Sequence, residues 1–420
     1  MTAVILAGGK GTRMSGLFPD IPKPLIPVCG KSVLLRQTEA LAANGIKKII
    51  IVTGYLSEKI ERDVSLCKKK NADISFFTEK TPLGTAGALF KLELNDDFLL
   101  LGGDLIFDVS FEKMLAFHKN NNALATLFSH PNSHPADSAL IKADEQGRIT
   151  DFIPKENREG YFQNLCNAGI QIISPELLRL FRCDGKADLD ADILRPAVKT
   201  GRIFSYKSSE YVRDMGTPER YAAVSKDVER GLVSQRNLNN KQKAVFLDRD
   251  GTINVFNGFI TSPGQLSLIP GAAQAIKKIN SLGYLAVVIT NQPVIARGDI
   301  TESELKNIHN RLETLLGEEG AYLDGIFYCP HHPDSGFIGE RTRLKIKCEC
   351  RKPAPGLILR AAREFNIDLS QSYMAGDSRR DIFAAQNAGC TPVFIGDDLP
   401  ENSPKNALLF GSLKEFADSL

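Results

Sequence analysis

A short apolar run that leads straight into a glycine-rich loop opens this chain. Residues 3–6 are apolar, and the segment LAGGKGTRM occupies residues 6–14. The run predicts a buried strand, and the glycines let the loop backbone approach phosphate oxygens because they lack a Cβ atom. Arg13 and Lys23 add cations suited to a polyphosphate. We therefore expect an anion site formed by these two cations and by Leu6, Ala7, Gly8, Gly9, Gly11 and Thr12.

Taken alone, this loop leaves a generic glycine turn as the alternative. Two other nucleotide motifs do not fit. A dinucleotide fingerprint requires a third glycine where Met14 stands, and a Walker loop requires a glycine near Val4 and a hydroxyl residue directly after Lys10. Neither requirement is met.

Four later segments follow in order: PLGTAG at 82–87, LGGD at 101–104, NAG at 167–169 and DMGTP at 214–218. With the first loop they resemble the sugar nucleotidyltransferases, which join a sugar 1-phosphate to a nucleoside triphosphate. The resemblance implies a Rossmann-like nucleotide-diphospho-sugar transferase domain. It also implies that Gly84 and Thr85 contact the nucleoside, that Asp104 and Asp214 bind Mg²⁺, that Asn167 and Gly169 contact the sugar, and that Lys155 contacts its phosphate.

In such a reaction a sugar phosphate oxygen attacks the α-phosphate in line while pyrophosphate leaves. We therefore assign positioning and charge stabilisation to Arg13 and Lys23, and no nucleophile to the protein. An aspartate beside glycine is commonly a turn residue. Asp104, however, follows the apolar residues 98–101, which places it at the carboxyl end of a buried strand, where open α/β sheets bind ligands. For Asp214 both interpretations stay open.

A second strand-to-loop motif stands midway along the chain. Residues 244–247 are apolar, and DRDGT follows at 248–252. This motif resembles the signature of the haloacid dehalogenase-like phosphatases, with Asp248 as the nucleophile that forms an aspartyl phosphate and Asp250 as the acid and base. A calcium loop would continue with further oxygen ligands and a late glutamate, which are missing here.

The remaining phosphatase elements follow the same order. The resemblance implies that Thr290 and Lys352 hold the phosphate, and that Asp248, Asp250 and Asp377 bind Mg²⁺. Asp381 has two open interpretations, a direct role at this site or a carboxylate at a helix N-terminus.

Four soft ligands cluster before Lys352, namely Cys329, His331, Cys348 and Cys350. Their spacing suits structural Zn²⁺, with His332 as a less favoured ligand. The other five cysteines are scattered, which does not indicate a secreted disulfide framework, and we expect them to be buried thiols. They are Cys29, Cys67, Cys166, Cys183 and Cys390.

The zinc loop narrows the resemblance to the histidinol-phosphate and D,D-heptose 1,7-bisphosphate phosphatases. The Ala-Arg-Gly element at 296–298 favours the heptose enzymes, and it implies that Arg297 binds the second phosphate, with Asn291 and Arg351 as further substrate contacts. Pro293 and Val294 replace the usual Ser-Gly, which stiffens the backbone near the substrate and leaves the sugar preference open. Removing the 7-phosphate leaves a heptose 1-phosphate, which the first half would activate.

Length and patterning predict two α/β domains: a transferase domain at 1–226, a linker at 227–242 and a phosphatase domain at 243–420. Apolar runs at 48–52 and 284–289 predict strands, and amphipathic stretches at 34–44 and 300–316 predict helices. A net charge of +2 does not indicate a nucleic-acid or membrane surface, and we read the lysine run at 68–70 as surface. Without a signal peptide or a membrane-spanning run, a soluble cytoplasmic protein is expected.

The favoured hypothesis is a bifunctional enzyme that uses heptose phosphates and a nucleoside triphosphate. GTP is preferred by analogy, and a homo-oligomer is left open. Two alternatives remain: a mannose or glucose 1-phosphate nucleotidyltransferase fused to a histidinol-phosphate-type phosphatase, and a ligand sensor with one inactive domain. A sensor predicts missing catalytic groups, yet every group named above is present.

Overall fold

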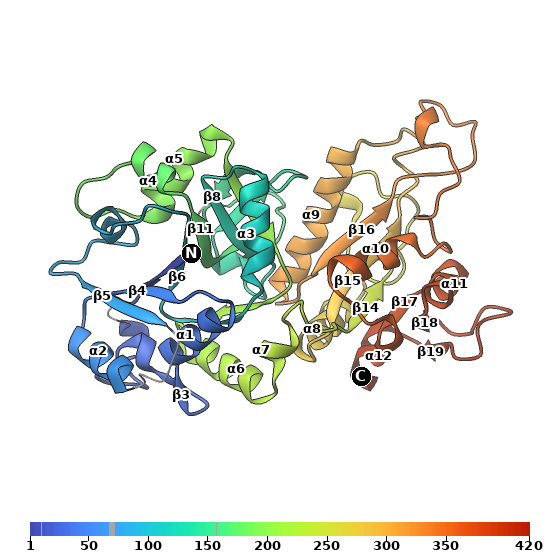
Figure 1. Cartoon of the computed structure of the whole chain (residues 1–420). Coiled ribbons are helices and arrows are strands. Elements are labelled where there is room, and N and C mark those ends of the chain that lie inside the picture. Colours follow the sequence, from blue (N-terminus) through green and yellow to red (C-terminus); the bar gives the residue numbers. More distant parts are fainter. Residues whose placement is uncertain (10, 67–71, 157) are drawn as a thin grey trace. The chain divides into compact units, whose positions relative to one another are not determined.

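The computed structural model of the chain describes residues 1–9, 11–66, 72–156 and 158–420. Cys67 was expected to be buried, and the lysine run at 68–70 was expected to be exposed. Both lie outside the described residues. The chain divides into two compact units, shown in sequence colours in Figure 1. Unit 1 comprises residues 1–130, 141–153 and 167–237, and unit 2 comprises residues 131–140, 154–166 and 238–420.

Unit 1 is organised around β1 (Thr2–Leu6), a short strand that is parallel to both neighbours, β4 (Lys48–Thr53) and β6 (Phe98–Gly102). Its side chains alternate between two apolar clusters, with Val4 in one and Ala3 and Ile5 in the other. Both faces of the strand are therefore buried. Because β1 and β6 are parallel, the glycine loop after β1 and the turn after β6 emerge at the same edge of the sheet.

Further strands extend this sheet, which has the order β10-β9-β11-β6-β1-β4-β5, with β8 paired to β11 and β12. A separate antiparallel pair, β7 with β13, aligns Leu105 with Asp214. The elements of the N-terminal part not bounded above are β2 (Pro27–Val28), β3 (Lys31–Ser32), β5 (Asp73–Thr78), β7 (Leu105–Asp108), β8 (Ala125–His130), β9 (Leu140–Ala143), β10 (Ile149–Ile153), β11 (Cys166–Ile173), β12 (Ile203–Lys207), β13 (Tyr211–Asp214), α1 (Val33–Ala43), α2 (Ser57–Leu66), α3 (Phe111–Asn120), α4 (Pro175–Leu180), α5 (Arg195–Ala197), α6 (Pro218–Glu229) and α7 (Leu232–Gln235).

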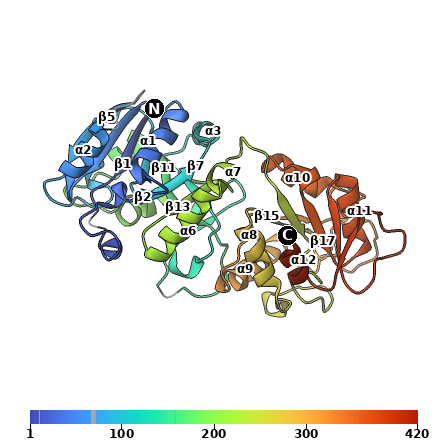
Figure 2. The same ribbon diagram turned by 90° about the horizontal axis from the view of Figure 1, so that it is seen from below.

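Unit 2 contains a six-stranded parallel sheet with the order β16-β15-β14-β17-β18-β19. Val245 and Leu247 face one apolar cluster, and Ala244 and Phe246 face another. Figure 2 shows α8, α9 and α12 on one side of the strands and α10 and α11 on the other. The bounds are β14 (Ala244–Leu247), β15 (Leu285–Asn291), β16 (Gly325–Cys329), β17 (Tyr373–Gly376), β18 (Thr391–Ile395), β19 (Leu408–Phe410), α8 (Ala272–Ser281), α9 (Glu302–Glu318), α10 (Gly356–Glu364), α11 (Arg379–Ala388) and α12 (Leu413–Ser419).

The division into units does not fall at one point of the chain. Residues 131–140 and 154–166 group with unit 2, and the last change of unit comes after Asn237. The expected linker at 227–242 contains the end of α6 and all of α7. Within the residues that the structure describes, no helix is both long enough and apolar enough to cross a membrane.

The expectation of buried thiols is wrong for two cysteines. Cys166 and Cys390 are buried, whereas Cys29 is exposed and Cys183 is half-buried. Cys29 has a φ of 48° in the tight turn that joins β2 to β3. A residue at the tip of such a turn points away from the core, so its apolar character does not decide its burial.

Candidate active sites

The first candidate site lies at the edge of the unit 1 sheet where β1 and β6 end. The Gly103 amide donates to the Leu6 carbonyl over 2.9 Å, which ties the two loops together. Lys23 Nζ lies 2.5 Å from Asp104 Oδ2. A Cβ atom on Gly216 would lie 3.3 Å from Lys23 Nζ and 3.5 Å from Arg13 Nη2. The two predicted cations therefore converge on the turn after β13.

Asp214 ends β13 and accepts hydrogen bonds from both a backbone amide and a guanidinium group. The Gly216 amide donates to Oδ1 over 2.9 Å, and Arg220 Nη1 lies 3.0 Å from both oxygens. Burial raises the pKa of Asp214, but the Gly216 amide, Arg220 and Lys23 outweigh it, so the pKa lies below its usual value. Asp214 is therefore a carboxylate at neutral pH, and Arg220 is a partner that sequence analysis missed.

The glycine loop is open at some positions and crowded at others. A Cβ atom on Gly9 would meet nothing within 4 Å, whereas one on Gly8 would lie 3.0 Å from Glu79 Oε2. Gly11 has a φ of 63° and precedes the short helical turn of Thr12 and Arg13. Of the expected loop, Leu6 ends the strand and Ala7 is buried.

The expected nucleoside loop packs tightly against residues 185–189. Gly84 has a φ of 78°, and a Cβ atom there would lie 2.3 Å from the Ala187 carbonyl oxygen. Thr85 Oγ1 donates to Asp188 Oδ2 over 3.1 Å and accepts from the Leu189 amide over 2.7 Å. The threonine hydroxyl is thus occupied in fixing the loop.

The expected sugar-contacting residues fall into different units. Asn167 Oδ1 accepts from the Gly169 amide and from Gln171 Nε2, each over 3.0 Å. Lys155 belongs to unit 2, where its Nζ lies 3.6 Å from Asp137 Oδ1 and both side chains are exposed. Asn167 and Gly169 belong to unit 1. The structure therefore does not bring Lys155 together with them inside one unit.

The second candidate site lies at the carboxyl edge of the unit 2 sheet. Asp248 follows β14, Asp377 follows β17, and Asp381 lies in the first turn of α11. Their carboxylate oxygens lie within 4.8 Å of one another, a grouping able to hold a cation. Asp250 is not in this group, so the group differs from the predicted set of Asp248, Asp250 and Asp377.

A buried lysine neutralises part of this acidic group. Lys352 Nζ lies 2.8 Å from Asp248 Oδ1 and 2.6 Å from Asp381 Oδ1, and only 3% of its side chain is exposed. Burial lowers the pKa of Lys352, but the two carboxylates outweigh it and leave the pKa above its usual value. Burial, followed by repulsion from Asp381, raises the pKa of Asp248 to about 7 despite the lysine.

Asp381 lies at the start of α11 and also contacts the buried lysine. Its Oδ2 accepts from the Ser378 amide over 3.0 Å and from the Ser378 hydroxyl over 2.6 Å, which forms a capping box at the start of α11. Its Oδ1 faces Lys352. The helix cap thus fixes the carboxylate that shares the lysine with Asp248.

Three side chains hold the carboxylate of Asp250. Oδ1 accepts from Arg249 and from Asn254 Nδ2 over 3.0 Å, while Oδ2 accepts from Arg249 Nη2 over 2.8 Å and from Gln292 Nε2 over 2.9 Å. Gln292 Nε2 also donates to Thr290 Oγ1 over 2.8 Å. Arg249, Asn254 and Gln292 were not predicted from the sequence, although Arg249 stands inside the DRDGT motif and Gln292 directly follows Asn291.

The other predicted phosphatase contacts mostly serve the loop of Lys352. Asn291 Oδ1 accepts from the Lys352 amide over 3.0 Å, and Asn291 Nδ2 donates to the Lys352 carbonyl over 3.2 Å. Arg351 Nη1 donates to the His331 carbonyl over 3.2 Å. Arg297 Nε lies 3.1 Å from Asp299 Oδ2. Asn291 therefore contacts the backbone of Lys352, and Arg351 contacts the backbone of His331.

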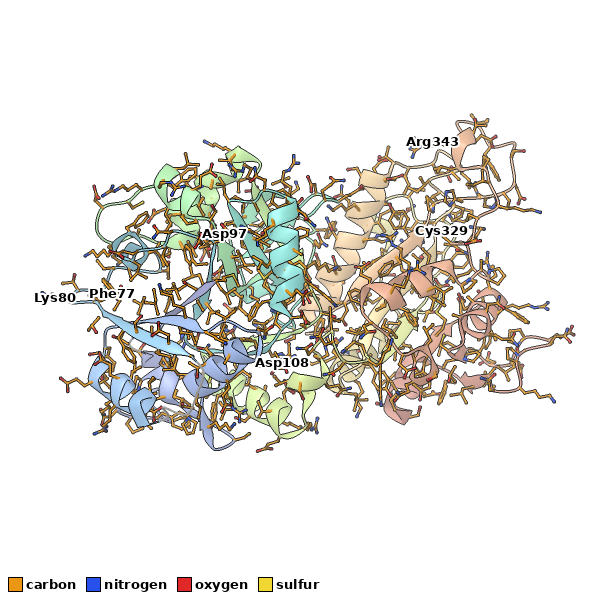
Figure 3. All side chains as sticks on the ribbon, viewed as in Figure 1. Phe77, Lys80, Asp97, Asp108, Cys329 and Arg343 are labelled. Atoms are coloured by element: carbon orange, nitrogen blue, oxygen red, sulfur yellow. The ribbon has the colours of Figure 1, made fainter. Side chains whose placement is uncertain are left out.

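The predicted zinc ligands form one cluster. The sulfur atoms of Cys348 and Cys350 are 3.2 Å apart, those of Cys329 and Cys350 are 3.3 Å apart, and His331 Nδ1 lies 3.2 Å from Cys350 Sγ. A tetrahedral Zn²⁺ with ~2.3 Å bonds to sulfur would separate its thiolates by roughly 3.8 Å, so a small expansion accommodates it. Cys329, the last residue of β16, is labelled in Figure 3. His332 instead accepts from the Asp334 amide over 3.2 Å.

Comparisons with known proteins match the N-terminal and C-terminal parts of the chain separately. The family model for nucleotidyl transferases matches residues 2–231, and that for HAD-hydrolase-like proteins matches residues 349–404. The D-glycero-beta-D-manno-heptose-1,7-bisphosphate 7-phosphatase of Yersinia pestis is 39% identical over 176 residues, which cover 42% of this chain and 92% of that protein. The Haemophilus ducreyi phosphatase of the same name is 43% identical over 149 residues, covering 35% of this chain and 79% of that protein.

Among solved structures, HddC from Yersinia pseudotuberculosis complexed with GMP-PN is 26% identical, covers 54% of this chain and 99% of that chain, and has a TM-score of 0.47. The nucleotidyl transferase match spans more than half of the 420 residues, and the phosphatase match covers nearly all of the Yersinia pestis protein. The chain therefore belongs to the nucleotidyl transferase family in its N-terminal part and to the heptose-1,7-bisphosphate 7-phosphatase family in its C-terminal part.

Proposed function

We propose that this chain carries out two consecutive reactions of nucleotide-activated heptose synthesis. The phosphatase site hydrolyses the 7-phosphate of D-glycero-D-manno-heptose 1,7-bisphosphate. The transferase site then joins the resulting heptose 1-phosphate to a nucleoside triphosphate and releases pyrophosphate. The arrangement of Lys352 between Asp248 and Asp381 carries the phosphatase half of this proposal, because it holds an anionic nucleophile and a buried cation side by side.

In the first reaction Asp248 acts as the nucleophile. Its Oδ1 is engaged by Lys352 and by the Arg249 amide, which donates over 2.7 Å, so Oδ2 is the oxygen left to attack phosphorus. The bond from phosphorus to the sugar oxygen breaks as the aspartyl phosphate forms. Lys352 offsets the charge that builds up on the phosphoryl oxygens.

Asp250 transfers the protons of this reaction. It gives one to the departing sugar oxygen, and it then takes one from the water that attacks the aspartyl phosphate. Both of its oxygens are occupied by Arg249, Asn254 and Gln292. The carboxyl group therefore has to exchange one of these partners for the leaving oxygen.

The carboxylates Asp248, Asp377 and Asp381 fit Mg²⁺, since their oxygens gather within 4.8 Å. When bound, Mg²⁺ would supply positive charge that lowers the repulsion between phosphate and nucleophile. Cys329, His331, Cys348 and Cys350 fit a structural Zn²⁺ that fixes the loop leading to Lys352. In unit 1, Asp104 and Asp214 are the carboxylates available for a second Mg²⁺.

In the second reaction the protein provides no nucleophile. The heptose 1-phosphate oxygen attacks the α-phosphorus, and the bond to the pyrophosphate oxygen breaks. Arg13 and Lys23 converge near Gly216, where their charge stabilises the nucleotide phosphates. We assign the contact with the nucleoside to Gly84 and the contact with the sugar to Asn167.

We propose GTP as the nucleotide on the basis of Glu79. This half-buried carboxylate lies beside Gly8 of the phosphate loop, and its Oε1 is buried with no hydrogen-bond partner among the described residues. Guanine presents two adjacent donors, N1–H and the 2-amino group, to which one carboxylate can bind. No other common base presents that pair.

Product analysis by mass spectrometry tests the two reactions together. The full chain is incubated with heptose 1,7-bisphosphate, Mg²⁺ and each nucleoside triphosphate in turn, and a GDP-heptose is expected only with GTP. Asp248→Asn should stop phosphate release but still convert added heptose 1-phosphate, and Asp104→Ala should do the reverse. Asp398→Asn, at an exposed site, serves as the control. Absence of phosphate release from the unchanged protein would refute the heptose assignment.

The base assignment has its own test. ITP lacks the 2-amino group, so the unchanged protein should prefer GTP over ITP by about 10-fold or more, as for a lost bidentate contact. Glu79→Gln should remove most of this preference. If the preference survives in Glu79→Gln, another group reads the base. If a different triphosphate is used, the GTP proposal is wrong.

A further inference from the structure

Arg297 is held between three loops of unit 2. It lies in the turn that follows β15, and its guanidinium carbon is 4.5 Å from the ring centroid of Phe259 and 4.5 Å from that of Phe337. Phe259 belongs to the loop after β14, and Phe337 to the loop between β16 and α10. Phe259 is 49% exposed, although a large apolar side chain ordinarily gains by burial. A cation with two rings against it is a built arrangement that the reaction described above does not use.

Backbone contacts fix the Phe337 loop directly on the turn of Arg297. A Cβ atom on Gly298 would lie 2.0 Å from the Gly339 carbonyl oxygen, so the two backbones touch. The Arg341 amide also donates to the Ala296 carbonyl over 2.9 Å. The position of the Phe337 ring relative to Arg297 is therefore set by the residues on either side of that arginine.

This packing determines which donors Arg297 can offer. Nε is buried, 3.1 Å from Asp299 Oδ2, and the two rings contact the guanidinium group. In the described part of the chain neither Nη group donates a hydrogen bond. The two Nη groups are therefore the donors left for a ligand, and their fork matches two oxygens of one phosphate. Contact with the rings also removes rotamers that a free arginine side chain would have to lose on binding.

We propose that Phe259 and Phe337 are specificity-determining positioning residues, which hold Arg297 so that its Nη groups bind the phosphate at C1 of the substrate. This inference rests on the proposed phosphatase function and adds to it a reason for preferring a sugar bisphosphate over a monophosphate. The rings themselves need not contact the reacting phosphate. Their removal should weaken binding of the distal phosphate and leave the chemistry at Asp248 intact.

The experiment compares two substrates that share the phosphate to be hydrolysed. These are heptose 1,7-bisphosphate and heptose 7-phosphate, which lacks the phosphate at C1. In Phe259→Ala and in Phe337→Ala, KM for the bisphosphate should rise about 3-fold, and about 10-fold in the double variant, as expected for loss of cation–π contacts. The kcat for both substrates and KM for the monophosphate should stay within 2-fold. Phe256→Ala is the matched control, because Phe256 lies in the same loop, is 59% exposed and makes no cation–π contact among the described residues.

Two outcomes separate this inference from its alternatives. If the rings act through Arg297, Phe259→Ala should have no further effect in an Arg297→Met background. An equal loss on both substrates, or an undiminished loss in that background, would overturn the role assigned to the rings. If the unchanged protein itself does not distinguish the two substrates, the proposed bisphosphate function fails, and the ring variants are not needed to show it.

Discussion

Replacing Lys352 by methionine should destabilise the phosphatase unit in a pH-dependent way. The lysine side chain is 3% exposed and lies within 2.8 Å of Asp248 and 2.6 Å of Asp381. Methionine has a similar length and no charge, so the variant leaves two carboxylates facing each other at a largely dry site. Removal of one partner from a buried ion pair costs about 3–5 kcal/mol. We expect a loss of that size at pH 8.5 in Mg²⁺-free buffer.

The pH dependence follows from the carboxyl pKa. With the lysine present, burial and Asp381 already raise the pKa of Asp248 to about 7. In Lys352→Met that pKa should rise further, so the folded variant retains a proton that the unfolded chain has released. A group that binds its proton more tightly when folded makes stability fall as pH rises. The penalty should therefore grow above pH 7, by about 1.4 kcal/mol per pH unit, until the new pKa is passed.

Calorimetry of the full chain measures this penalty, with the phosphatase transition identified as the one that shifts when Mg²⁺ and orthovanadate are added. Lys414→Met is the control, because it removes an exposed ion pair with Asp418 and should leave stability nearly unchanged at any pH. Adding Asp381→Asn to Lys352→Met should restore part of the stability. A penalty that is the same at pH 6 and pH 8.5, with no restoration in the double variant, would contradict the buried-charge explanation.

Three further substitutions test close contacts seen in the structure. In Gly84→Ala, the new Cβ would lie 2.3 Å from the Ala187 oxygen at a φ of 78°, so KM for the nucleotide should rise, whereas Gly264→Ala, at an open position outside the nucleotide loops, should leave it unchanged. In Gly251→Ala, the Cβ would lie 2.0 Å from Asp377 Oδ2, so phosphate release should slow about 10-fold or more, as expected for a displaced catalytic group, while nucleotidyl transfer is spared. In Cys350→Ser, elemental analysis should find less than one zinc per chain, because a thiolate ligand is lost.

The aspartates at strand ends were predictable because a short apolar run indicates a buried strand, and the residue that follows the run lies at the carboxyl end of that strand. Apolar runs preceded Asp104 and Asp248, and both residues lie at the carboxyl edge of a sheet. The cluster of Cys329, His331, Cys348 and Cys350 was also predictable, since within each pair the two side chains are separated by one residue. The amphipathic stretch at 300–316 corresponds to α9, displaced by two residues at each end.

The partners of these groups could not be predicted in the same way. Arg249, Asn254 and Gln292 are ordinary polar residues in sequence, and their role depends on a convergence of two loops around Asp250. Similarly, Asn291 looks like a substrate ligand until its amide is seen to bind the backbone of Lys352. Which of several polar side chains faces a ligand and which faces the protein is decided by tertiary contacts.

Each candidate site places a lysine from another segment against an aspartate at a strand end, but the two pairs differ in burial. Lys23 and Asp104 side chains are 16% and 27% exposed, whereas Lys352 and Asp248 are 3% and 13% exposed. Solvent can replace the lost partner of Asp104, so Lys23→Met should cost about 1 kcal/mol of stability, nearer to a surface pair. Its nucleotidyl transfer should nevertheless fall by about 100-fold or more, the scale for removing a preorganised charge. Calorimetry and initial rates on one preparation would show this separation, and a large stability loss in Lys23→Met would mean that Asp104 is less accessible to water than its exposure implies.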